Sequence, residues 1–500
     1  MAKGNVKKGF ATYIVILFMA IVAAFFILVA IMLFSPFKSI LGFKYFIYRD
    51  EVKIKEVEFE KEKQRLDFSN LKKITINCGF ADVKIEKRSL DNCYIQIENN
   101  CSGFAREDMD TDFVSEVNYT SSAKDEISVK IREPEGFVYF NKGIVISLLV
   151  PQQIKTSFEN TVVDITNTDG TVYIGNQFEQ DNTTSGSYDF SLAFKSLNIK
   201  NKNGKVLVYA NNQLPEGKQF VTDKMFVKTN NGDIEVRRDL TINDFSLYAS
   251  KARITFNSIY VKNAKFDLGN SDFVATRIKV DDGQSPESAV NEVDLIIDGG
   301  YFTLGEMIGS LSTNEMTRDM GRATIKIRKI TGNISFPNAN NARITIDETA
   351  NNSQILIRGK DSTIKLNKFT SKAWLETTGG SVSVNAGFND TSDQSATMTP
   401  YLNVKTYSGA INVVYNCQKL RSGGIDLLTT NGAVNLKVRN TLSYYLMVVN
   451  TSNVARDGKN VSVEGFDSDV TFPLKIQNGS SAPTDTIKIM SNKNVKVSLI

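Results

Sequence analysis

One short phrase recurs through most of this chain and constrains its fold more than any other feature. The phrase has a β-prone segment, a Thr or Asn with a small or polar residue, a Gly, and a second β-prone segment. The clearest copies are WLETTGGSVSVNA, LNVKTYSGAINVVYN and IDLLTTNGAVNLKV. Their glycines, Gly380, Gly409 and Gly432, are 29 and 23 residues apart. A period of this length is typical of solenoid repeats.

Looser copies of the phrase extend back toward residue 71. Their turn glycines are Gly79, Gly170, Gly204, Gly232 and Gly332. Asn-Gly, Asp-Gly and Gly-Gly pairs predict tight corners with positive φ. Alternating apolar residues predict strands with one buried face, and the Thr or Asn before each turn is expected to stack on its equivalents and bond the corner backbone. The glycines are therefore interpreted as corners of a scaffold and not as a ligand-binding signature.

These features predict an all-β fold, a β-solenoid resembling a parallel β-helix, over residues 71–500. An antiparallel sandwich or tandem β-domains is the alternative, since short strands and Gly turns occur there as well. Two segments depart from the phrase, 105–124 and 281–322, and both are predicted to be excursions from the solenoid. The second is the best candidate for an insertion on a binding face, although a plain loop is the favoured interpretation. The last residues, IKIMSNKNVKVSLI, are predicted to form a strand pair that caps the stack.

An apolar run lies near the amino terminus. From Tyr13 to Phe34 no residue is charged, and a helix of this length would span about 33 Å, enough for a hydrocarbon core of about 30 Å. We predict a retained transmembrane helix over 13–34 that contacts membrane lipid. A cleaved signal peptide is the alternative, but Ser35-Pro36 follows the run without a small-x-small site.

The flanking segments complete the predicted topology. Basic residues near the helix are equal in number on its two sides, so orientation is inferred from the short amino terminus. Residues 1–12 are predicted to be cytoplasmic, and the chain beyond the helix is predicted to be extracytoplasmic. Residues 35–70 read as an aromatic and basic juxtamembrane collar followed by a charged stalk.

Composition narrows the functional classes. The chain has no histidine, which disfavours many hydrolases and zinc sites, and its net charge of +4 over 500 residues disfavours a nucleic-acid partner. Phosphate-loop, nucleophile-elbow and HExxH motifs are absent from the sequence. No cofactor is predicted. The cysteines, Cys78, Cys93, Cys101 and Cys417, lack CxxC spacing and fit either one local disulfide or buried free thiols.

One acidic loop carries candidate metal ligands. Asp108, Asp110 and Asp112 alternate like the start of a calcium loop. Phe113 and Tyr119 stand where an EF-hand requires Gly and Glu. A solvated acidic loop is the favoured interpretation, and no metal site is predicted.

The repeated elements resemble a known family. DITNTDGTVYIGN, VKTNNGDIEVRR, LETTGGSVSVNA and LLTTNGAVNLKV are similar to the repeats of the bacterial putative-adhesin family of unknown function. The resemblance covers residues 71–500 apart from the two departures. It implies a β-solenoid exposed at the cell surface, with adhesion to a surface glycan or protein partner, and it supplies no catalytic residues.

Three functions follow from these observations. The first is a membrane-anchored surface protein whose solenoid is an adhesin-like or envelope scaffold and binding module, and not an enzyme. The second is a β-helix carbohydrate-active enzyme that uses Asp294 and Asp298 on one strand face, with Asp281 and Asp282 nearby. That chemistry needs carboxylates about 5 to 9.5 Å apart. The third is a membrane-associated assembly component with the same fold.

Overall fold

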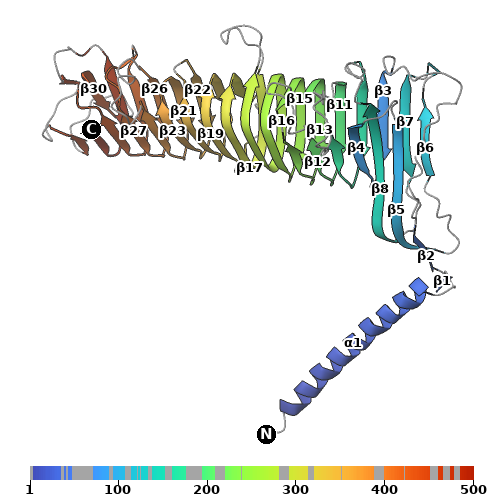
Figure 1. The fold of residues 1–500 in the computed structure, drawn as a ribbon. Helices are drawn as coiled ribbons and strands as arrows, with labels where there is room; N and C mark the ends of the chain where they lie inside the picture. Colours follow the sequence, from blue (N-terminus) through green and yellow to red (C-terminus); the bar gives the residue numbers. More distant parts are fainter. Residues whose placement is uncertain are drawn as a thin grey trace, which may run out of the picture.

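The computed structural model shows one helix and a long body of stacked β-strands (Figure 1). All strands that it defines join a single continuous sheet. It describes residues 4–34, 39–40, 43–47, 71–88, 94–106, 114–120, 122–123, 125–132, 138–151, 160–175, 194–208, 220–237, 239–280, 292–313, 320–350, 352–387, 399–421, 423–450, 460–465, 473–477, 483 and 485–500.

Helix α1, Gly4–Phe34, extends away from the β-body (Figure 1). Its described side chains, at residues 12–27 and 30, are uncharged, and the large apolar ones from Tyr13 to Ile27 are more than half exposed except for Val22, which is partly buried. Among the residues that the structure describes, no helix combines the length and the apolar character needed to cross a membrane. The transmembrane span predicted over 13–34 stays a prediction.

The body is a β-solenoid of parallel coils, in which each coil places one strand on face A and the next on face B. Face A contains β7 (Glu126–Arg132), β3 (Lys73–Cys78), β9 (Val162–Asn167), β11 (Phe194–Asn201), β13 (Phe220–Thr229), β15 (Leu240–Ser250), β18 (Ser310–Ser312), β20 (Asn333–Phe336), β22 (Gln354–Gly359), β24 (Lys372–Thr377), β26 (Tyr401–Thr406), β28 (Ile425–Thr429), β33 (Thr486–Ser491) and β30 (Tyr444–Val449).

Face B is the second wall of the same coils. It contains β8 (Val138–Pro151), β4 (Asp82–Arg88), β10 (Val172–Ile174), β12 (Val206–Val208), β14 (Ile234–Val236), β19 (Thr324–Thr331), β21 (Arg343–Thr349), β23 (Thr363–Phe369), β25 (Val382–Ala386), β27 (Ile411–Tyr415), β29 (Val434–Val438), β34 (Val495–Leu499) and β31 (Val461–Val463). The long strands β16 (Arg253–Val280) and β17 (Glu292–Ile308) bend at corners and contribute to both faces.

Alternation in the sequence produces this architecture directly. In β9 the side chains of VVDITN alternate between buried and partly exposed, and strands of neighbouring coils pair in register, so apolar residues stack in columns between the faces. In the middle coils the column is aromatic, and the Phe273 and Phe302 rings stack at 4.8 Å. The prediction of an all-β chain with parallel, repeated coils is confirmed.

At the amino-terminal end, the order of the coils in space differs from their order in the sequence. The β3–β4 coil pairs on one side with β9–β10 and on the other with β7–β8, which comes later in the chain. Antiparallel strands β6 (Val114–Tyr119) and β5 (Tyr94–Arg106) then pair with β7 and β8. They cover strand edges that would otherwise be free to pair with another chain.

The carboxyl-terminal end repeats this arrangement. Strands β33 and β34 lie between the β28–β29 coil and the β30–β31 coil, although they end the sequence. The short strand β32 (Leu474–Ile476) pairs with β30 in antiparallel orientation. The prediction that the last strand pair caps the stack is therefore wrong: this pair is an inner coil, because its apolar residues pair on both sides.

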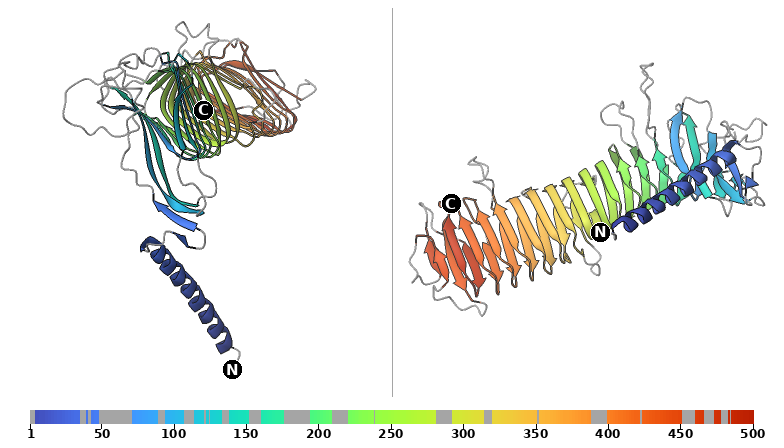
Figure 2. Two further views of the ribbon diagram at one scale, coloured as in Figure 1. Left: turned by 90° about the vertical axis from the view of Figure 1, so that its right-hand side faces the viewer. Right: turned by 90° about the horizontal axis from the view of Figure 1, so that it is seen from below.

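An arm extends from the amino-terminal end toward α1. Strands β5 and β8 are longer than the coil is wide, and beyond the solenoid they bend toward the helix (Figures 1 and 2). Strand β2 (Phe43–Ile47) pairs with β5, and β1 (Ser39–Ile40) pairs with β2. Part of the predicted juxtamembrane collar thus belongs to the sheet, whereas residues 48–70 of the predicted stalk lie outside the described residues.

The predicted excursions also differ from the structure. Strand β6 lies inside 105–124, and β17 and β18 continue both faces through residues 292–312 of the segment 281–322. This segment escaped recognition because Gly299 and Gly300, both with positive φ, make its corner with a sequence unlike the phrase. Asp108, Asp110, Asp112, Asp281 and Asp282 lie outside the described residues.

Candidate functional site

The turn glycines stack at the corners of the coils. A Cβ atom added at Gly204 would lie 1.5 Å from the carbonyl oxygen of Gly170, and one at Gly432 would lie 2.0 Å from that of Gly409. The predicted reason, positive φ, applies only to Gly170 and Gly332 among the eight glycines. At five of the others, glycine is required because a carbonyl oxygen of the adjacent coil lies where a Cβ atom would be. These five are Gly204, Gly232, Gly380, Gly409 and Gly432. Gly79 is the exception, with nothing within 4 Å of an added Cβ.

Asn and Thr side chains before these glycines bond the corners from inside. The Asn167 side-chain amide donates to the Ala81 carbonyl at 2.8 Å, the Asn201 amide donates to the Gly170 carbonyl at 3.0 Å, and the Thr429 hydroxyl donates to the Gly409 carbonyl at 3.2 Å. All three side chains are buried. These amide and hydroxyl donors are therefore buried and bonded to backbone carbonyls, which supports a structural role for the corner residues.

The carboxylates proposed for an enzyme do not form a catalytic pair. Asp294 and Asp298 share one face of β17, with Ile296 between them. Four residues at about 3.3 Å each place them about 13 Å apart along the strand, beyond the range of about 5 to 9.5 Å for glycosidic bonds. Asp294 is paired with Lys265 in the sheet register. No group of three or more potential metal ligands occurs among the described residues.

The described cysteines are buried free thiols. Cys78, Cys101 and Cys417 form no disulfide, and Cys93 lies outside the described residues. Burial raises the pKa of Cys78 and of Cys417 to about 12, so neither thiol is a nucleophile near neutral pH.

A solvent-facing group of side chains on face A is the best candidate site. We call it the aromatic patch: Trp374, Tyr401, Asn403, Asp426 and Lys488. Trp374 is the single tryptophan of the chain, and its ring centroid lies 5.4 Å from that of Tyr401. In the register of the sheet, Trp374 is next to Asn403, Asn403 is next to Asp426, and Asp426 is next to Lys488. Four successive strands thus form the patch.

The polar side of the patch is partly desolvated. Burial raises the pKa of the Asp426 carboxyl, and the charge of Lys488 offsets part of the rise. In the adjacent column, Glu376 lies 3.3 Å from the Lys405 ammonium and 3.7 Å from Nε of Arg358. The patch therefore combines the apolar faces of two rings with hydrogen-bond donors and acceptors, one of them acidic and one basic. Such a surface suits a neutral ligand with many hydroxyl groups.

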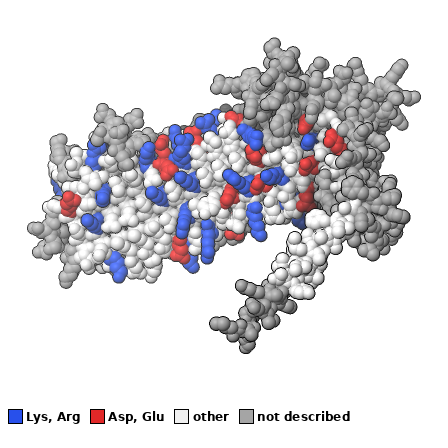
Figure 3. Space-filling view, turned by 60° about the horizontal axis from the view of Figure 1, so that its bottom comes forward, with Lys and Arg blue, Asp and Glu red and all other residues white. Residues whose placement is uncertain are grey.

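Charge elsewhere on the solenoid is mixed. On the face that Figure 3 shows, Lys and Arg are interspersed with Asp and Glu along the coils, and no continuous basic stripe is seen.

The aromatic patch was not predicted from the sequence, although its two aromatic residues lie in the clearest copies of the repeated phrase. Trp374 and Tyr401 occupy outward positions of two successive phrases, WLETTGG and YLNVKTYSG. Large aromatic residues on the solvent side of an alternating strand were the available signal, because such positions are normally polar.

Comparisons with known proteins are sparse. No family model and no curated protein matches the chain. Among solved structures, the chain is similar to a putative adhesin from Parabacteroides merdae ATCC 43184, with 10% sequence identity, a TM-score of 0.24, and coverage of 66% of this chain and 95% of that chain. That description matches the family that the repeated elements resemble.

Proposed function

We propose that this chain is a surface-exposed, non-enzymatic binding module that recognises glycans through the aromatic patch. The observation that carries the proposal is the solvent-facing pair of Trp374 and Tyr401, with ring centroids 5.4 Å apart on adjacent parallel strands. Aromatic rings pack against the C–H face of a sugar ring, and burial of apolar area there is favourable. Asn403, Asp426 and Lys488 continue the row on the neighbouring strands, where hydroxyl groups of adjoining sugars would accept or donate hydrogen bonds.

The regular spacing of the coils favours an extended ligand. Equivalent side chains recur about every 4.8 Å along a parallel sheet, and the patch crosses four strands, β24, β26, β28 and β33. A short oligosaccharide lying along the solenoid axis would contact the rings and the polar groups together. A single sugar would use only part of the patch.

The experiment is a glycan-array screen of the full chain and two variants. Trp374→Ala is expected to lower affinity at least tenfold, since it removes a central aromatic contact. Tyr301→Ala is the matched control, because Tyr301 is 58% exposed but lies on face B. Equal binding by wild type and Trp374→Ala, or no binding to any glycan, would contradict the proposal. Release of reducing ends from a bound polysaccharide would instead favour the enzyme.

The proposal includes a membrane anchor at residues 13–34, with the solenoid outside the cytoplasm. Its support is the uncharged sequence of this run and the exposed apolar side chains of α1. Protease added to intact cells is expected to digest the solenoid and to leave the amino-terminal segment intact. Full protection of the solenoid would overturn this topology. A membrane-associated assembly component remains the second candidate, which co-purification of a partner protein in place of glycan binding would favour.

A further inference from the structure

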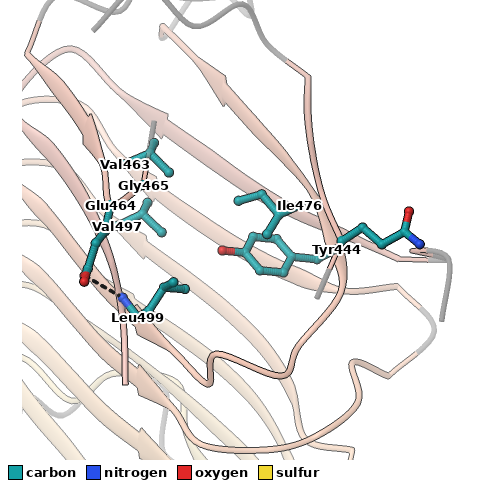
Figure 4. A pocket seen from close by; sticks show the side chains of 8 residues that line it. Tyr444, Val463, Glu464, Gly465, Ile476, Val497 and Leu499 are labelled. Atoms are coloured by element: carbon teal, nitrogen blue, oxygen red, sulfur yellow. Dashed lines mark hydrogen bonds between the residues drawn. The ribbon is translucent and has the colours of Figure 1, made fainter. Parts of the chain in front are cut away.

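A cavity of about 230 Å³ lies inside the solenoid at its carboxyl-terminal end. Its lining combines an apolar floor of Val463, Ile476, Val497 and Leu499 with the side chain of Tyr444. Figure 4 shows the Tyr444 ring reaching from one side of the cavity toward Val463 and Val497 on the other. Glu464, Gly465 and Gln477 lie at the exposed rim.

The cavity exists because the end coil, β30–β31, is shorter on face B than the adjacent coil, β33–β34. Strand β31 pairs with β34 only up to Val463 and Val497. At Gly465 the backbone takes a φ of +85° and leaves the sheet, whereas β34 continues to Leu499. The Glu464 carboxylate accepts the Leu499 backbone N–H at 2.9 Å, so it replaces the strand partner that is missing there (Figure 4).

Tyr444 brings an unpaired polar group into this cavity. Its side chain is fully buried, and its hydroxyl has no hydrogen-bond partner among the described residues. Burial also raises the pKa of Tyr444, so the hydroxyl stays protonated and can donate. A buried hydroxyl without a partner destabilises a protein, and phenylalanine would fill the same space without that cost. A tyrosine here is explained if a ligand supplies the missing partner.

We propose that this cavity binds a small uncharged ligand with an apolar body and one hydrogen-bond acceptor oxygen, which receives the Tyr444 hydroxyl. A dry apolar cavity of about 150 Å³ holds one benzene molecule, so the larger volume here fits a single ring or branched chain with a short substituent. The apolar floor takes the body of the ligand. The Glu464 carboxylate at the rim disfavours anions. This site is separate from the aromatic patch and does not depend on the proposed glycan binding.

The test uses the full chain in lipid nanodiscs, which keeps detergent out of the cavity, with empty nanodiscs as background. Three probes are titrated by ligand-observed NMR: acetophenone, with a ring and an acceptor oxygen; ethylbenzene, with the ring alone; and benzoate, with a charge. Acetophenone is expected to bind saturably and more tightly than benzoate. Tyr444→Phe should weaken acetophenone binding by about 2- to 13-fold, the equivalent of one net hydrogen bond, and leave ethylbenzene binding unchanged.

Two controls keep the result interpretable. Tyr445→Phe changes the neighbouring, outward-facing ring, and should leave all three probes unchanged. Thermal melting of Tyr444→Phe without ligand should match or exceed wild type, because the unpaired hydroxyl is gone. Absence of saturable acetophenone binding, equal acetophenone affinity in wild type and Tyr444→Phe, or an equal loss in Tyr445→Phe would overturn the proposal.

Discussion

Replacing Gly409 with alanine tests whether close backbone approach holds the coils together. A Cβ atom there would lie 1.6 Å from the carbonyl oxygen of Gly380 in the coil above. To bring that distance to 3.0 Å, below which real Cβ contacts essentially do not occur, the two corners must separate by about 1.4 Å, against a strand spacing of about 4.8 Å. The bond from the Thr406 hydroxyl to the Gly409 carbonyl, now 2.7 Å, lies at the corner that must move.

The expected loss for Gly409→Ala is about 3 to 5 kcal/mol, the sum of overpacking strain and weakened corner hydrogen bonds. Because each coil contacts only its neighbours, the damage should be local. Denaturant unfolding followed by Trp374 fluorescence is therefore the assay, since Trp374 and Gly380 belong to the coil that Gly409 would displace. The chain need not unfold in one step, so hydrogen exchange of strands β24 to β29 accompanies the titration.

Gly79→Ala is the matched control for this prediction. Gly79 occupies the same place in its phrase, but nothing lies within 4 Å of an added Cβ and its φ is not positive. Alanine there is expected to be neutral or stabilising by about 0.4 to 1 kcal/mol through the unfolded state. If Gly409→Ala changed stability no more than Gly79→Ala did, close approach would not be the reason for the glycine columns.

Two further predictions concern the carboxyl-terminal end and the buried thiols. Deleting residues 485–500 removes β33 and β34 from between their neighbours, so hydrogen exchange should show that β30 loses protection completely; protection retained in β30 would contradict the inner position of the pair. Folded Cys78 and Cys417, with pKa raised to about 12 from 9.0, should be alkylated about 10³-fold more slowly at pH 8 than unfolded chain. Because the folded pKa values are the raised ones, the free energy of unfolding should fall as pH rises from 9 toward 12, which alkaline denaturant titrations would reveal.

The repeated phrase was sufficient to predict the coils because its signals are local. Alternation specifies which side chains face inward, and a buried Asn or Thr specifies the corner, as in Asn201 and Thr429. These requirements act within a few residues. What the phrase did not reveal is why glycine is needed: at Gly409 the reason is the carbonyl of Gly380, 29 residues away, and no local pattern contains that atom.

The aromatic patch shows the same limit at the level of function. Alternation alone places Trp374 and Tyr401 on the solvent side of their strands. Their contact, and the row through Asn403 and Asp426, depend on the register between coils. Register follows from the length of the connection between coils, which varies along this chain, so the patch could be assembled only in three dimensions.

At both ends the order of the coils in space differs from their order in the sequence. This arrangement affects which surfaces of the solenoid are open to a partner. A parallel stack has two open ends whose unpaired backbone groups would recruit another copy. Here antiparallel strands β5 and β6 cover one end, and β32 pairs with part of the other. At each end, the coil next to the last one is not its neighbour in sequence order: β3–β4 lies between β7–β8 and β9–β10, and β33–β34 lies between β28–β29 and β30–β31. The end coil therefore cannot detach without also pulling on the connection that leads to the inner coil. Growth by end-to-end stacking is therefore disfavoured, and the two surfaces that we propose for recognition are the outward face that carries the aromatic patch and the cavity beside Tyr444.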